Sequence, residues 1–204
     1  MRDIVQQTAA LDPQYKSYLR FVEADDAEYI VQLRSNQELS RYLTASPADV
    51  EKQRQWILNY KERELEGQEF YFVIMSERAE HGVVRMYDFR EIDGEPSFSW
   101  GSWIIPPPRP SGLVTFSAIT MYEIGFDALR LPRAHFEVVK GNTGVVAFHE
   151  RAGAVVESED EEKFYFRYLP ANYQEFRARS EPQIKQHRQP WPPQEPVRFS
   201  ASTS

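Results

Sequence analysis

The organisation of this chain is decided by residues 104–114, which read Ile104-Ile105-Pro106-Pro107-Pro108-Arg109-Pro110-Ser111-Gly112-Leu113-Val114. The prolines must end the preceding strand, because proline has no N–H group to donate to a sheet ladder. A mostly apolar, buried helix is then expected from Ser111-Gly112 to Leu129. The first N–H groups of a helix lack intrahelical partners and attract anions. Gly112 would let an anion approach the main chain closely, although a plain strand-to-helix turn explains the same residues.

Upstream of this stretch, three strands predict an antiparallel meander. Residues 70–75 are apolar on both faces, which is typical of a covered central strand. Residues 83–89 form the next strand, and the Asp93-Gly94 pair is a hairpin signal. Residues 97–105 then return as the partner strand.

Before the meander we expect one strand and two helices. Residues 18–22 are rich in aromatic and β-branched side chains and predict the strand. The first helix begins after Asp25-Asp26 and extends to Arg34, with apolar residues on one face. The second helix takes Ser46 as its N-cap and ends at Gly67.

Downstream of the long helix the pattern returns to strands. We predict a strand over residues 134–139, a helix over residues 142–152, and closing strands near residues 155–156 and 164–168. The order of these elements predicts an α+β, mixed α/β fold, in which a central mixed sheet of about seven strands is flanked by about four helices.

The chain is expected to form one domain with an extension at each end. We assign residues 1–16 to an N-terminal extension, residues 17–170 to the domain, and residues 171–204 to a tail. The tail is rich in proline, so we expect it to be mostly irregular, with a helical piece near residues 173–179.

Composition excludes several classes of function. The sequence has no cysteine, which excludes disulfides and a thiol nucleophile, and its formal net charge of −7 disfavours nucleic-acid binding. It has no apolar run long enough to span a membrane and no apolar core of a secretory signal, so we expect a cytoplasmic protein. The spacing of the four histidines predicts no metal site.

Two motifs carry a resemblance to a known family. Residues 109–114 look like the pyrophosphate loop [QR]-x-x-G-x-[GA] of the GNAT (Gcn5-related N-acetyltransferase) superfamily, although Val114 replaces the usual glycine or alanine. Residues 142–154 are similar to that family's helix N-x-x-[AS]-x-x-[LF]-[YF]-[EK]-[KR]-x-G-[FA]. The resemblance covers roughly residues 17–170 and implies that the fourth and fifth strands splay apart to make a cofactor cleft.

The resemblance implies an acetyl-CoA site without a metal. The diphosphate would lie on the main chain of six consecutive residues, Arg109, Pro110, Ser111, Gly112, Leu113 and Val114. The pantetheine arm would pair with the backbone of Trp103, Ile104 and Ile105, and Asn142 would bind it from the other side. An acceptor amine would then attack the thioester directly, with no covalent enzyme intermediate.

Candidate catalytic residues follow from the same resemblance. His149 stands where family members commonly have a tyrosine that protonates the leaving thiolate, and imidazolium is a competent donor near neutral pH. A histidine simply packed beside the cofactor is the alternative. Asp88 and Glu95, at strand ends, are candidates for the base, as are Glu123 and a water relay.

Residues of the central strands could line the acceptor pocket. We name Arg85, Tyr87, Trp100 and Ser102 as wall residues, although core packing also explains the aromatic ones. The expected acceptor is a primary amine of a small molecule, with an amino sugar or sugar nucleotide favoured. Acetylation of a protein N-terminus and a non-catalytic acyl-CoA-binding module stay open as alternatives, as does a homodimer.

Overall fold

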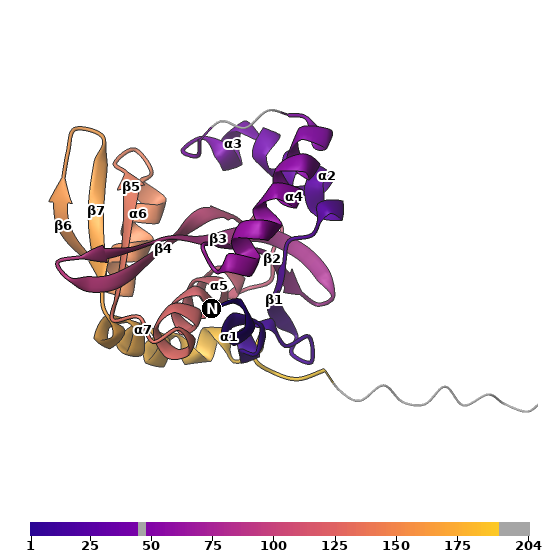
Figure 1. Cartoon of the computed structure of the whole chain (residues 1–204). Helices are drawn as coiled ribbons and strands as arrows, with labels where there is room; N and C mark the ends of the chain where they lie inside the picture. Colours follow the sequence, from indigo (N-terminus) through magenta and orange to yellow (C-terminus); the bar gives the residue numbers. More distant parts are fainter. Residues whose placement is uncertain (45–47, 192–204) are drawn as a thin grey trace, which may run out of the picture.

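The fold is built on one seven-stranded sheet with the strand order β1-β2-β3-β4-β5-β7-β6 (Figure 1). The computed structural model describes residues 1–44 and 48–191. All neighbouring strands are antiparallel except β4 and β5, which confirms the predicted mixed sheet and its N-terminal meander. The strands are β1 (Ser17–Phe21), β2 (Phe70–Ser76), β3 (Ala79–Ile92), β4 (Glu95–Ile104), β5 (Arg133–Val139), β6 (Val155–Glu159) and β7 (Lys163–Tyr168).

The β3–β4 hairpin turns at the predicted Asp93-Gly94 pair. Both residues have positive φ, 55° and 79°, as a two-residue hairpin turn requires. β3 is longer than residues 83–89, because its pairing with β2 and β4 extends the ladder at both ends.

The two parallel strands separate soon after they meet. β4 and β5 pair only at Ser97↔Arg133 and Phe98↔Ala134, although β4 has 10 residues and β5 has 7. Beyond these pairs the strands diverge, which confirms the expected splay and opens the sheet at its centre.

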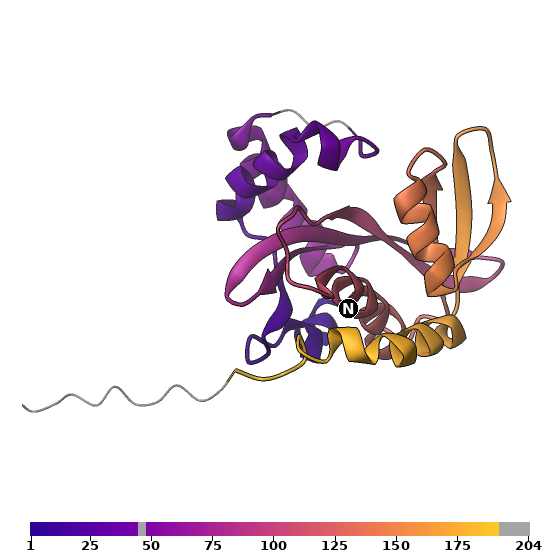
Figure 2. The ribbon, with the colours of Figure 1, turned by 180° about the vertical axis from the view of Figure 1, so that it is seen from behind.

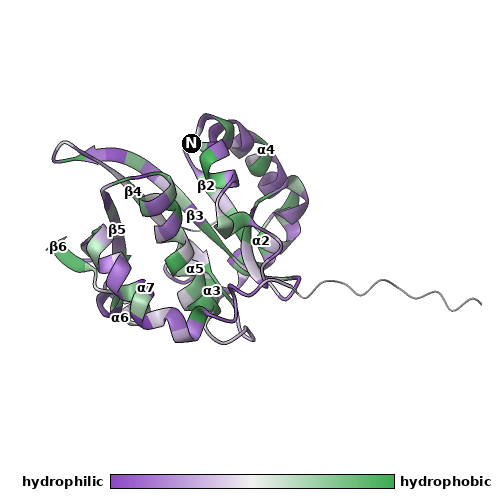
Figure 3. Cartoon of the chain, turned by 90° about the horizontal axis from the view of Figure 1, so that it is seen from below, coloured by the Kyte–Doolittle hydropathy of each residue, from purple (hydrophilic) through white to green (hydrophobic). Residues whose placement is uncertain are grey.

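Helices cover the two faces of the sheet with two hydrophobic cores. α5 packs with α6 and α7 against one face, whereas α2 and α4 pack against the other face of β1–β4. In Figure 3, α4 is largely purple, whereas α5, in the middle of the molecule, is largely green and white. The apolar composition of α5 agrees with its burial on almost all sides. The helices are α1 (Arg2–Gln6), α2 (Ala27–Ser35), α3 (Gln37–Ser40), α4 (Val50–Glu66), α5 (Leu113–Tyr122), α6 (Thr143–Ala152) and α7 (Pro170–Ile184). Short 3₁₀ turns lie at Ala9–Leu11 and Ala24–Asp26.

The α4 helix begins later than predicted. Its N-cap is Asp49, whose carboxylate accepts a hydrogen bond from Lys52 N at 3.0 Å, and the predicted cap Ser46 lies outside the described residues. Its end at Gly67, with φ 74°, is as predicted.

The predicted long helix changes its winding after Tyr122. Residues Glu123–Ala128 form a π-helical segment that completes the run to Leu129. Within it, Gly125 lies against the ring of Phe98 so closely that an added Cβ would be 2.0 Å from Phe98 Cζ. A side chain at this position could not be accommodated without moving the helix from the sheet.

The expected mostly irregular tail begins instead with a 15-residue helix, α7. Its buried side chains Tyr173, Phe176 and Ile184 join the α5 core, and this burial extends the helical piece predicted at residues 173–179 to the whole of Pro170–Ile184. Residues 185–191 then follow the domain surface, since Lys16 N donates to Gln189 O and Trp191 N donates to Gln14 O. Residues 192–204 lie outside the described residues.

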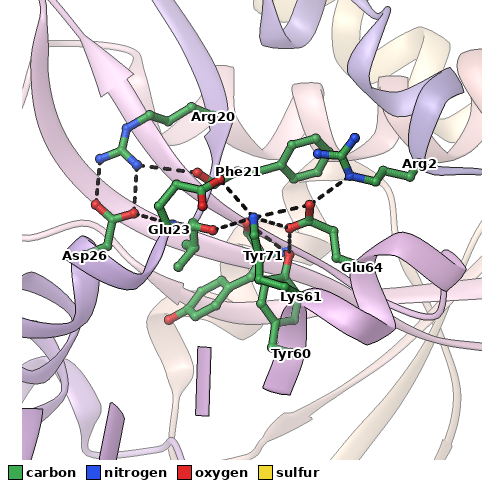
Figure 4. A network of polar contacts seen from close by, with 10 residues as sticks. Arg2, Arg20, Phe21, Glu23, Asp26, Tyr60, Lys61, Glu64 and Tyr71 are labelled. Atoms are coloured by element: carbon green, nitrogen blue, oxygen red, sulfur yellow. Dashed lines mark hydrogen bonds and ion pairs between the residues drawn. The ribbon is translucent and has the colours of Figure 1, made fainter. Parts of the chain in front are cut away.

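A polar network ties α1 and β1 to α4 (Figure 4). The carboxylate of Glu64, which is 1% exposed, accepts hydrogen bonds from Arg2 at 2.9 Å, Tyr60 at 2.7 Å and Lys61 at 3.0 Å. The N-terminal extension is therefore held to the domain by a buried, fully engaged carboxylate.

Candidate functional site

The divergence of β4 and β5 opens a cleft of about 580 Å³. Residues 100–103 of β4 form one wall, and Phe136–Val139 of β5 with Asn142, Val145 and His149 form the other. Arg34 and residues 41–44, which connect α2 to α4, line its rim. In Figure 1, β5 and α6 stand on one side of the central strands β3 and β4, and the helices α2, α3 and α4 stand on the other.

The loop before α5 carries free main-chain donors. Gly112 is the N-cap of α5 with φ 84°, and among the described residues no hydrogen-bond partner exists for the amides of Gly112, Val114 and Thr115. Leu113 N donates to Pro110 O at 3.2 Å. Of the six residues predicted to bind a diphosphate, Pro110 has no N–H and Leu113 uses its own, so four amides remain, those of Arg109, Ser111, Gly112 and Val114.

The reason for glycine at position 112 differs from our expectation. A Cβ there would lie 2.3 Å from the carbonyl oxygen of Gln183, at the end of α7. Glycine is thus required by contact with the protein's own C-terminal helix, as well as by its positive φ.

Only one of the three residues expected to hold the pantetheine arm lines the cleft. Trp103 does so, with its Nε1 donating to Ser117 Oγ at 3.1 Å. Ile104 is buried in the core below α2 and α4, and Ile105 O accepts from Arg109 at 3.1 Å. The strand bulges at Ser102, where φ is 48°, so that successive side chains of β4 do not alternate regularly between the two faces of the sheet.

Asn142, the N-cap of α6, and His149, within α6, both line the cleft. His149 is 5% exposed and packs against Phe136, with the ring centroids 4.3 Å apart. Burial lowers the pKa of His149 to about 3, and its Nδ1 has no partner among the described residues. The imidazole is therefore neutral at neutral pH and carries a single N–H, as the packed alternative predicts, and the role of His149 as the acid stays a prediction.

Asp88 lines a second hollow of about 350 Å³, which shares Tyr87, Phe136 and Glu137 with the cleft. Asp88 has φ 52° at a bulge of β3, so it faces the same side of the sheet as its neighbour Tyr87. Its Oδ2 accepts a hydrogen bond from His135 Nε2 at 3.0 Å, and Arg90 approaches the same oxygen at 3.5 Å. Oδ1 has no partner among the described residues.

His135 was not predicted as a site residue. It is 7% exposed, and its Nδ1 lies 2.7 Å from Ser97 Oγ. Burial lowers its pKa, so the ring is neutral at neutral pH and holds Asp88 through Nε2–H. One pattern in the sequence could have indicated this site. In β4 the small residues Ser97, Ser99 and Gly101 alternate with large aromatic residues, which leaves space for a side chain of the next strand on the face of the small residues.

The structure places the other two base candidates away from both the cleft and the hollow. Glu95 is exposed beside the hairpin turn, where it pairs with Ile92. Glu123 pairs with Arg188 at 2.7 Å and lines a separate cavity of about 140 Å³.

All four predicted wall residues, Arg85, Tyr87, Trp100 and Ser102, line the cleft. Arg85 is held by an ion pair with Glu69 and lies over the ring of Tyr87 at 5.5 Å. Trp100 is 4% exposed and packs edge-on against Tyr122, so core packing accounts for most of its surface.

Charges in the cleft and hollow are unevenly compensated. Glu137 pairs with Lys163, and Glu157 pairs with Arg133 and Arg167. Arg34 and Arg41, on the rim, have no carboxylate partner in the part of the chain that the structure describes. The rim therefore carries net positive charge, despite the acidic chain.

Within residues 1–44 and 48–191 no group of His, Asp or Glu side chains is arranged to hold a metal ion. In the same ranges no helix combines the length and apolar character needed to cross a bilayer.

Comparison with known proteins identifies the fold. FdhC, a nucleotide-linked sugar GNAT solved in the apo form, is 39% identical, and the match covers 86% of this chain and 96% of FdhC with a TM-score of 0.74. Spermidine N-acetyltransferase from Vibrio cholerae, in complex with CoA and spermine, is 20% identical over 78% of this chain and 98% of its own, with a TM-score of 0.65. Ribosomal-protein-S5-alanine acetyltransferase from Vibrio fischeri is 16% identical over 78% and 95%, also with a TM-score of 0.65. The last two show the fold alone.

A search of curated proteins gave no match. The family model for the acetyltransferase (GNAT) domain matches residues 17–155. This match spans the meander, the splayed strands and the helix α6, and it agrees with the identity to FdhC. The chain therefore belongs to the GNAT family and is an N-acetyltransferase.

Proposed function

We propose that this protein transfers the acetyl group of acetyl-CoA to a primary amine of an amino sugar, with a sugar nucleotide as the favoured acceptor, by direct attack of the amine on the thioester. The observation that carries this proposal is the 39% identity, over 86% of the chain, to FdhC, a nucleotide-linked sugar GNAT. No similar identity links the chain to the spermidine or ribosomal-protein acetyltransferases named above.

Residues of the cleft and of the loop before α5 together fit acetyl-CoA. The free amides of Gly112, Val114 and Thr115 are donors for a diphosphate at the start of α5, where the helix dipole also favours an anion. The gap between β4 and β5 offers the pantetheine arm an apolar surface at Trp103 and a polar side chain at Asn142. Acetyl-CoA supplies an acetyl group that is already activated as a thioester.

The positive charge on the rim of the cleft favours an anionic acceptor. Arg34 and Arg41 are without carboxylate partners in the described chain, and guanidinium groups bind phosphates in bidentate geometry. A polyamine would instead require an unpaired carboxylate for each of its several ammonium groups, whereas two of the three acids that line the hollow, Glu137 and Glu157, are engaged in ion pairs. The charge of the site thus favours a sugar phosphate or sugar nucleotide over a polyamine.

Asp88 is the residue we assign to the acceptor amine. Its Oδ1 is free, and His135 fixes its Oδ2, so the carboxylate can hold an ammonium group and accept its proton. His135 is a positioning residue, because both of its ring nitrogens are occupied by Asp88 and Ser97.

Thiol release tests the proposal. We would supply acetyl-CoA with four acceptors: an amino sugar joined to a nucleoside diphosphate, the same sugar free, spermidine, and a peptide with a free N-terminus. We expect the highest kcat/KM for the sugar nucleotide. Turnover of the peptide alone would instead establish the N-terminal acetyltransferase alternative. CoA binding by calorimetry without turnover of any amine would establish a non-catalytic binding module.

A further inference from the structure

A chain of buried hydrogen bonds connects the strands β1 and β2 to the loop before α5. Ser76 and Ser17 are joined by their hydroxyl oxygens at 2.8 Å, and Ser17 Oγ lies 2.7 Å from His187 Nδ1. His187 Nε2 lies 2.9 Å from Ser111 O. The two serines and His187 are each at most 2% exposed.

The partners fix the direction of these bonds. Ser111 O can only accept, so His187 carries its proton on Nε2, and Nδ1 accepts from the hydroxyl of Ser17. Gln186 Nε2 donates to the same Ser111 oxygen at 2.6 Å. Two donors from the segment after α7 therefore hold a single carbonyl group of the loop.

Holding this carbonyl also orients the next amide. The Ser111–Gly112 peptide is trans, and the C=O and N–H of a trans peptide point in opposite directions. With Ser111 O turned toward Gln186 and His187, Gly112 N–H points away from the C-terminal segment. This N–H has no partner among the described residues, which leaves it available to a ligand.

The fit of the C-terminal segment against the loop is close. The carbonyl oxygen of Gln183 occupies the space that a Cβ of residue 112 would need, at 2.3 Å. Figure 2 shows α7 running along the base of the molecule below α5, with its C-terminal end beneath the loop that leads into α5. The loop has three prolines before Arg109 and one after it, so few of its own amides can stabilise it.

We propose that Gln186 and His187, which lie beyond the residues matched by the GNAT family model, are positioning residues for the diphosphate of acetyl-CoA. They hold Ser111 O so that Gly112 N–H stays turned outward beside the amides of Val114 and Thr115. This inference rests on the proposed use of acetyl-CoA.

The test compares CoA, which has the diphosphate, with S-acetylpantetheine, which lacks it. Gln186→Ala is the main variant, because Gln186 is exposed and its loss leaves the core intact. We expect its Kd for CoA, measured by calorimetry, to rise about fivefold to tenfold, which corresponds to one lost hydrogen bond. Its KM for S-acetylpantetheine should stay within twofold of the wild-type value, a change in binding free energy of roughly 0.4 kcal/mol or less.

Three further variants are made: His187→Ala, His187→Gln and Gln189→Ala. Glutamine at position 187 keeps an N–H donor, so the CoA affinity of His187→Gln should lie between those of the wild type and His187→Ala. Gln189→Ala is the matched control, since Gln189 is an exposed glutamine of the same segment whose side chain contacts Lys16 and not Ser111. It should bind CoA as the wild type does.

Two results would overturn the inference. One is an unchanged Kd for CoA in Gln186→Ala and His187→Gln. The other is an equal loss with CoA and with S-acetylpantetheine, which would assign the segment a structural role only. Failure of the wild type itself to bind CoA is a different result and would overturn the proposed function instead.

Discussion

At the scale of single residues, Asp88 is the side chain on which the proposed chemistry depends most. Asp88→Asn keeps the size and the hydrogen-bond acceptor but removes the charge that holds an ammonium and accepts its proton. We expect kcat/KM for the amine to fall by about 10²–10⁴, the usual contribution of a general base, with the Kd for CoA unchanged. Initial rates and calorimetry on the same preparation measure both quantities.

His135→Gln and His135→Phe separate positioning from catalysis at this site. An amide at position 135 can still donate to Asp88, whereas phenylalanine cannot, so the glutamine variant should retain the larger share of kcat. The Kd for CoA should be the same in both variants, because His135 and Asp88 line the hollow and not the loop before α5. Equal kcat values for the two variants would contradict the assignment of His135.

His149 makes stability sensitive to acid. Its pKa is about 3 in the folded protein and 6.5 in the unfolded chain, so below pH 6.5 protons bind the unfolded state first. From this residue the free energy of unfolding should fall by roughly 2 kcal/mol between pH 7.5 and pH 5. Urea unfolding of His149→Phe should show a smaller drop. The drop should not vanish, because burial also lowers the pKa of His135 and His187.

At the scale of elements, α7 decides where the folding unit ends. A chain that stops after Leu169 loses the buried side chains of Tyr173, Phe176 and Ile184, each contributing about 2 kcal/mol. Their sum is comparable to the whole stability of a typical domain, so we expect no cooperative thermal transition. A chain that stops after Trp191 should melt like the full protein by circular dichroism. Cooperative melting of the shorter chain would show that α7 is an appendage.

The α1–α4 contact depends on one buried carboxylate. Glu64→Ala leaves Arg2, Lys61 and the hydroxyl of Tyr60 without their shared partner, and we expect a loss of about 3 kcal/mol in the free energy of unfolding. Glu66→Ala is the matched control on the same helix, because Glu66 is exposed and its one side-chain hydrogen bond within the described residues is with Gln68. A difference between the two variants of less than about 1 kcal/mol would contradict the role of Glu64.

At the scale of the whole molecule, one side chain joins the two sides of the cleft. Tyr42 OH donates to Gly141 O at 2.7 Å, between the α2–α4 connection and the β5–α6 turn, 99 residues apart in sequence. Tyr42→Phe should release the rim that carries Arg41 and raise the acceptor KM roughly twofold to tenfold, the range expected for one net hydrogen bond. Stopped-flow binding of CoA should be unaffected. A raised Kd for CoA with an unchanged acceptor KM would place this bridge on the cofactor side instead.

The sequence alone determined the local elements and the family. Prolines 106–108, the Asp93-Gly94 turn and Gly67 each act through the backbone of their own neighbourhood, so they fixed where strands and helices end without knowledge of the fold. The spacing of the two motifs around Gly112 and Asn142 was likewise readable, because it depends only on order along the chain.

Tertiary structure decided which of the candidate residues meet. Two bulges, at Asp88 and Ser102, break the alternation of strand faces, so sequence periodicity could not place Asp88 beside His135 or remove Ile104 from the cleft. Burial, which no local pattern reports, left His149 neutral and extended the helical piece predicted at residues 173–179 to a helix over residues 170–184. The physical reason is common to these cases: each outcome depends on contacts between residues tens of positions apart, and only the packed sheet brings those residues together.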